Sequence, residues 1–174
     1  MGWRDEDLPL VEEIGRAYEQ RDYDEMRRLL REHPEILRQD NGKDYWFLLA
    51  AQTGRLPLVQ ILVEEFGFDV NEPTGPEGSP EGVIRYAAAA GHLGVVRCLL
   101  DRGAEVNFVL KGQVRCLALA GAARGGHLEV VKMLVERGAD IHGSWCGMNP
   151  LMQAMFYGQK DIADYLRGVG VTGR

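Results

Sequence analysis

A turn position recurs through this sequence at intervals of 33, 37, 35 and 32 residues. Alanine always lies four residues before this position, and leucine always lies eight residues after it. The turn positions are Arg21, Gly54, Gly91, Gly126 and Gly158; the alanines are Ala17, Ala50, Ala87, Ala122 and Ala154; the leucines are Leu29, Leu62, Leu99, Leu134 and Leu166. A period of this length predicts a solenoid of stacked units, each too small to bury its own apolar face.

Each unit is predicted to be two helices joined by a tight turn. After the turn, Leu128, Val131 and Leu134 fall on one stripe at helical spacing, which indicates a helix with one buried face. The alanines before the turn favour a helix and allow a close approach to a neighbour. The turn glycine predicts a left-handed cap between the two helices. The expected fold class is therefore all-α, a solenoid of helical hairpins.

Three stretches resemble ankyrin repeats: GRLPLVQILVEEFGFDVN (54–71), GHLGVVRCLLDRGAEVN (91–107) and GHLEVVKMLVERGADIH (126–142). The opening motif of that family, T-P-L-H-x-A-A, persists mainly as Pro150, Leu151 and Ala154. The resemblance covers about residues 8–170 and implies a single ankyrin-type solenoid of about five repeats. The repeats would span roughly 8–40, 41–74, 80–110, 113–145 and 147–170.

The first copy departs from the pattern in its second helix. Glu25 and Arg28 occupy positions that are apolar in the later copies: Leu58, Val95, Val130 and Ile162 at the first, and Ile61, Cys98, Met133 and Tyr165 at the second. A terminal repeat needs a polar outer face because no neighbour covers it. The first repeat is therefore expected to be a degenerate cap.

The resemblance implies a binding surface formed by the concave face and by the loops between repeats, here 71–82, 107–116 and 142–149. Two of these loops carry apolar residues where the family usually has small or charged ones, and exposed apolar clusters often mark contact surfaces. The candidate contact residues are Phe108, Leu110, Arg115, Arg124, Trp145, Met148, Phe156 and Tyr157. In the alternative interpretation, Phe108, Leu110 and Trp145 fold back onto the neighbouring repeat.

The loop 71–82 contains three prolines and three glycines, which predicts an irregular insertion. Such a loop either becomes ordered when a partner binds or is an insertion without a function that the fold tolerates.

Charge is unevenly distributed along the chain. The formal net charge is −6, and residues 1–80 carry 9 basic and 18 acidic side chains, a net charge of −9. No basic cluster resembles a nucleic-acid footprint, so nucleic-acid binding is not expected. The acidic half would favour a partner with a basic surface, although solubility alone also explains it.

No apolar run approaches the roughly 18–20 residues of a membrane span, so no membrane association is expected. The odd number of cysteines, Cys98, Cys116 and Cys146, favours a reducing compartment, and we expect the protein in the cytoplasm. Cys98 replaces a core residue and is expected to be inert, whereas Cys146 lies on a loop. Trp46 is expected in the core.

No residue pattern points to chemistry. The family resemblance implies that His92 and His127 make structural hydrogen bonds at their turns, and no spacing fits a metal site or a cofactor site. The expected function is that of a non-enzymatic module, monomeric alone, that binds another protein. The alternative is an inhibitor or toxin-immunity protein that blocks the active site of a partner enzyme. An enzyme would require a convergent titratable cluster, and a purely architectural stack would require polar loops.

Overall fold

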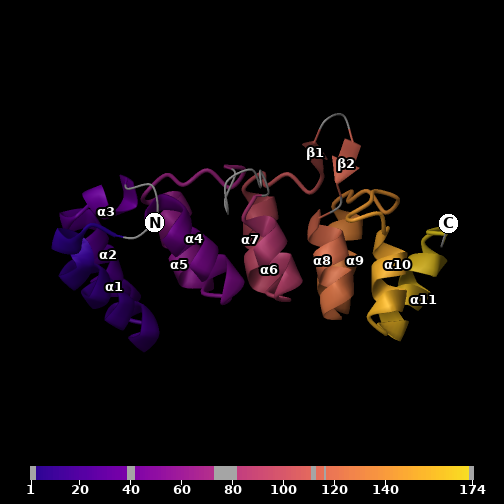
Figure 1. Cartoon of the computed structure of the whole chain (residues 1–174), viewed down its shortest axis with the longest axis horizontal. Helices are drawn as coiled ribbons and strands as arrows, with labels where there is room; N and C mark the ends of the chain where they lie inside the picture. The colour runs from indigo at the N-terminus through magenta and orange to yellow at the C-terminus, as the bar shows by residue number, and fades with distance from the viewer. Residues whose placement is uncertain (1–2, 39–41, 73–81, 111–112, 116, 173–174) are drawn as a thin grey trace.

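The computed structural model describes residues 3–38, 42–72, 82–110, 113–115 and 117–172, and in them the helices form pairs set side by side in a row (Figure 1). The pair α1 and α2 lies at one end of this row, and the pair α10 and α11 lies at the other. In chain order the helices are α1 (Leu8–Gln20), α2 (Tyr23–Glu32), α3 (Glu35–Arg38), α4 (Gly42–Gln52), α5 (Leu56–Glu64), α6 (Ile84–Ala89), α7 (Leu93–Asp101), α8 (Leu117–Gly125), α9 (Leu128–Glu136), α10 (Pro150–Phe156) and α11 (Lys160–Gly168). A short 3-10 helix, Asp5–Asp7, precedes α1.

The pairs are α1 with α2, α4 with α5, α6 with α7, α8 with α9, and α10 with α11. The first helices of the pairs stack in one row, in which α4 packs on α6, α6 on α8 and α8 on α10. The second helices form a parallel row from α2 to α11. The expected all-α solenoid of the ankyrin type is therefore confirmed. The loop 107–116 adds a small antiparallel hairpin of β1 (Phe108–Leu110) and β2 (Gln113–Arg115), which extends beyond the helices in Figure 1.

The recurring leucines form the core between the two rows. Leu29 is 3 % exposed, and the other four are completely buried. The recurring alanines are equally hidden, because the first helices approach one another across them. The core is therefore one continuous layer running the length of the described chain.

The last three turns are tied to the preceding repeat through the residue that follows the glycine. The Nε2 atom of His127 donates to the carbonyl of Ala89 at 3.1 Å, and His92 donates in the same way to Gln52 at 2.9 Å. These bonds confirm the structural role expected of both histidines. Gly91 lies directly under the imidazole of His127 with a φ of +78°. A Cβ atom at Gly91 would lie 2.3 Å from Nδ1 of His127. Glycine is therefore favoured here for two reasons: the left-handed backbone conformation and the lack of space for a side chain.

A second set of bonds links the repeats at the start of the loops and was not anticipated. The side-chain amide of Asn107 donates to the carbonyl of Gly138 at 2.9 Å and accepts from the backbone N–H of Asp140 at 2.7 Å. Asn71 makes the same pair of bonds to its own neighbour, at 3.0 and 2.7 Å. One amide thereby satisfies a donor and an acceptor of the next repeat.

The exposed face of α2 carries the ion pairs expected of a cap. Arg28 contacts Glu25 and Glu32, each at 2.6 Å. The hydrogen bond from Arg28 lowers the pKa of the Glu25 carboxyl. Because all three side chains face solvent, these pairs keep the end of the stack polar and add little stability.

We expect Gly91→Ala to lower the free energy of unfolding by about 2–3 kcal/mol. The left-handed φ alone costs a residue with a side chain about 1–2 kcal/mol, and displacement of His127 adds to this cost. Gly103→Ala is the matched control, because its φ is +84° and no atom lies within 4 Å of the added Cβ. Urea denaturation followed by circular dichroism measures both. Equal losses would show that His127 moves aside without cost.

We expect Asn107→Ala to lower the free energy of unfolding by about 2 kcal/mol, because it leaves the Asp140 N–H and the Gly138 carbonyl without their partner. The same denaturation experiment measures this loss. A variant as stable as the wild type would show that water replaces the amide.

Candidate protein-binding surface

The loop that carries Trp145 is a tight hairpin. The backbone N–H of Trp145 donates to the carbonyl of Met148 at 2.9 Å, and the reverse bond measures 3.0 Å. The two residues between them, Cys146 and Gly147, have φ values of 52° and 77°, the left-handed pair that two-residue hairpins require. The side-chain amide of Gln153 also donates to the Trp145 carbonyl at 3.4 Å. Trp145 is therefore presented by a fixed loop.

Arginine and aromatic side chains alternate across three repeats around Trp145. The guanidinium of Arg124 on α8 lies 5.8 Å from the centre of the Trp145 ring and 5.0 Å from that of Tyr157. The guanidinium of Arg85 on α6 lies 5.6 Å from the Trp145 ring and 4.9 Å from the Tyr86 ring. Each of these distances is within the range of a cation–π contact.

The solvent end of this cluster lies at the end of α10. The ring of Phe156 meets that of Tyr157 edge to face, with 5.1 Å between centroids, and Phe156 is 73 % exposed. Tyr157 is 43 % exposed. We name the whole set the arginine–aromatic stack; its members are Arg85, Tyr86, Arg124, Trp145, Phe156 and Tyr157.

Four of the eight candidate contact residues are thus brought together by the fold: Arg124, Trp145, Phe156 and Tyr157. Trp145 is half-buried against the core and also lies beside two guanidinium groups, and its role in binding a partner stays a prediction. Met148 is half-buried, and the backbone hydrogen bonds of the hairpin hold it opposite Trp145.

Phe108, Leu110 and Arg115 lie on the β1–β2 hairpin, where Phe108 pairs with Arg115 and Leu110 with Gln113. Their side chains lie outside the described part of the chain, so their role stays a prediction. The same holds for most of the insertion 71–82, of which residues 73–81 lie outside the described ranges.

Arg85 and Tyr86 were missed by the sequence analysis. They belong to α6, in the repeat before the one that carries Arg124 and Trp145, and no local pattern singles them out. Their contact with Trp145 depends on the hairpin folding back toward the first helices of earlier repeats.

The two cysteines of the described chain differ in burial. Cys98 is buried, and burial is the main cause that raises the pKa of its thiol. Cys146 is exposed at the hairpin turn. Within the described ranges, no group of three or more histidine, cysteine, aspartate or glutamate side chains is placed to hold a metal ion. No helix in these ranges has the length and apolarity needed to span a membrane.

Comparison with protein-family models gives a match over residues 84–172, to the model for ankyrin repeats in three copies. The matched segment contains α6 to α11 and slightly more than half of the chain. No curated protein matches the sequence. The helix pairs, their turn glycines and this match agree, and the chain belongs to the ankyrin repeat family.

Proposed function

We propose that this protein is a recognition module that binds a partner protein through the arginine–aromatic stack and the loops beside it. Ankyrin repeats generally mediate protein–protein interaction and generally act as non-enzymatic modules. The observation that carries the proposal is the exposure of Phe156, 73 %, at the end of a cluster of ordered arginines and aromatic rings.

The composition of the stack is that of an interface anchor. Tryptophan, tyrosine and arginine dominate the residues whose truncation weakens protein complexes. Arg124 contacts two rings at once, and a guanidinium that is already ordered loses less side-chain entropy when a partner binds. An exposed phenylalanine is otherwise an unfavourable contact with water, which binding would remove.

The charge distribution supports a partner with a basic surface. Residues 1–80 carry the net charge of −9, while the stack lies in the half with a net charge of +3. A basic partner would be steered toward the acidic end and anchored at the other. We further propose that the protein is a cytoplasmic monomer that binds no nucleic acid.

We expect Phe156→Ala to weaken binding to the partner about thirtyfold, because truncation of an aromatic anchor costs about 2 kcal/mol. The partner is first identified by affinity capture from the native host and mass spectrometry, and its affinity is then measured by calorimetry. The free energy of unfolding should change by less than about 0.5 kcal/mol, since Phe156 is mostly outside the core. Trp145→Ala should weaken binding and also cost stability, because Trp145 packs on the core.

Val169→Ala is the control, an apolar residue that is 38 % exposed and outside the stack. It should bind like the wild type. The proposal is wrong if Phe156→Ala and Arg124→Ala both bind as the wild type does. If the partner is an enzyme, stoichiometric loss of its activity on binding would identify this protein as an inhibitor.

A further inference from the structure

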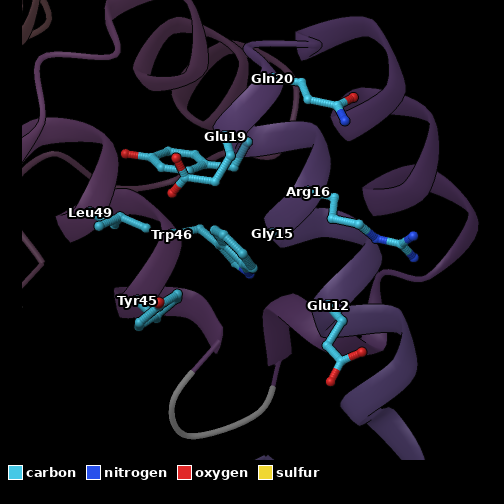
Figure 2. A pocket seen from close by; sticks show the side chains of 9 residues that line it. Glu12, Gly15, Arg16, Glu19, Gln20, Tyr45, Trp46 and Leu49 are labelled. Carbon is cyan, nitrogen blue, oxygen red and sulfur yellow. The ribbon is translucent and has the colours of Figure 1, made fainter.

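A groove of about 640 Å³ opens between α1 and α4, at the other end of the solenoid from the arginine–aromatic stack (Figure 2). Its α1 wall includes Glu12, Gly15 and Glu19. Its α4 wall includes Tyr45, Trp46 and Leu49. No candidate contact residue from the sequence analysis lies here.

The groove exists because the first two repeats do not close on each other as the later ones do. In the described residues α6 packs closely on α8, whereas α1 and α4 make few contacts. Tyr18 lies where repeats two to four have alanine, and its ring is buried against Trp46 with 6.2 Å between centroids. Its hydroxyl donates to Thr53, so the bulky side chain is anchored as a spacer between the helices.

Gly15 lies inside α1, where glycine costs about 1 kcal/mol relative to alanine. The usual reason for such a glycine is close packing. At Gly121 on α8 a Cβ atom would lie 3.1 Å from the Cβ of Ala89. At Gly15 no atom lies within 4 Å of an added Cβ, so close packing does not explain this glycine. It leaves the groove wall without a side chain beside Trp46 (Figure 2).

Trp46 forms the floor of the groove and has an unused donor. Its side chain is only 2 % exposed, and within the described ranges its Nε1 atom has no hydrogen-bond partner. A buried donor without a partner costs about 1–3 kcal/mol, which an acceptor on a ligand would recover. Tyr45 packs edge to face on Trp46 with 5.0 Å between centroids and is itself 46 % exposed.

The rim is acidic. Glu12 and Glu19 are exposed and lie two helical turns apart on the same face of α1. Arg16, between them, extends away from Trp46 in Figure 2, whereas Glu19 extends across toward α4. Aromatic walls below two carboxylates form a site for a cation that also has apolar surface.

We propose that this groove binds an arginine side chain presented by an extended segment of a partner protein. The guanidinium pairs with Glu12 and Glu19 above the ring of Tyr45, and a neighbouring backbone carbonyl accepts from Trp46 Nε1. Arginine is favoured over lysine because its planar, weakly hydrated group stacks on aromatic rings and forms paired bonds to carboxylates. The inference rests on the proposed protein-binding role and adds a second anchor that is independent of the stack.

The test uses the full chain labelled with ¹⁵N and a blocked peptide, acetyl-Gly-Ala-Arg-Ala-Gly-amide. The indole N–H signal of Trp46 is assigned by its absence in Trp46→Phe, and that of Trp145 is the internal control. The arginine peptide should shift the Trp46 signal and leave Trp145 in place. Peptides with lysine, norleucine or glutamate instead of arginine should bind more weakly, the last two by at least about tenfold.

Two variants keep the result interpretable. Gly15→Leu should abolish the shift by filling the groove, while Gly15→Ala, with only a methyl group, should retain it; both should unfold at or above the wild-type denaturant midpoint. Glu12→Gln combined with Glu19→Gln should weaken the arginine peptide about tenfold without changing the norleucine peptide. Phe156→Ala should bind the peptide as the wild type does, so this result is separate from the test of the stack.

The proposal is overturned if no peptide shifts the Trp46 signal, since the groove is then not a binding site for such a segment. It is equally overturned if the glutamate or norleucine peptide binds as tightly as the arginine peptide, or if Gly15→Leu leaves the shift unchanged.

Discussion

Every feature of this protein depends on shared burial between neighbouring helix pairs. A pair of helices of about ten residues each has one apolar face and too little surface to cover it alone. Leu62, Leu99 and Leu134 are fully buried only because the next pair lies against them. The pairs must then repeat in the same orientation. As a result, the turns lie along one edge of the stack and the loops between repeats lie along the other (Figure 1). The bonds from His127 and Asn107 to neighbouring backbone fix the spacing between pairs.

This alignment places one exposed position of every repeat in a single row along the first helices. The row consists of Glu19, Gln52, Ala89, Arg124 and Phe156, all of which are exposed. Its first member is acidic and belongs to the groove, while its last two belong to the arginine–aromatic stack. A partner segment lying along the row would meet carboxylates at one end and arginine and aromatic groups at the other. The two proposed anchors are therefore two ends of one surface.

The first and last helix pairs depart from the middle ones at the same position in the pattern, the one next to the recurring alanine. In the middle repeats it holds Ala51, Ala88 or Ala123, which allow close packing. Tyr18 faces the next repeat and leaves a groove beside it. In the last described pair this position holds Met155, which is 53 % exposed. A large side chain at this position therefore marks a side of a helix pair on which, in the described chain, no neighbouring pair packs closely.

The repeat pattern alone was sufficient to predict the helix pairs, the turn glycines, the buried leucines and the polar cap. These features depend on residues that are close in sequence, and comparison of the copies shows the period at which they recur. The family resemblance, which implies a binding surface on the concave face and the loops, led to the prediction of Arg124, Trp145, Phe156 and Tyr157 as contact residues. It did not indicate Arg85 and Tyr86, because the contact of Arg85 with Trp145 joins residues 60 positions apart in the sequence. It also placed Trp46 in the core without showing that its Nε1 lacks a partner.

The sequence by itself determined that the chain is a solenoid, because the spacing of apolar residues sets which faces must be buried. Only the tertiary structure decided what the surface contains. Whether α1 and α4 close or stay apart depends on the volume of Tyr18 between them. Whether an arginine contacts one ring or two depends on the distance between repeats. Such distances result from the packing of many side chains at once, and no single stretch of sequence encodes them.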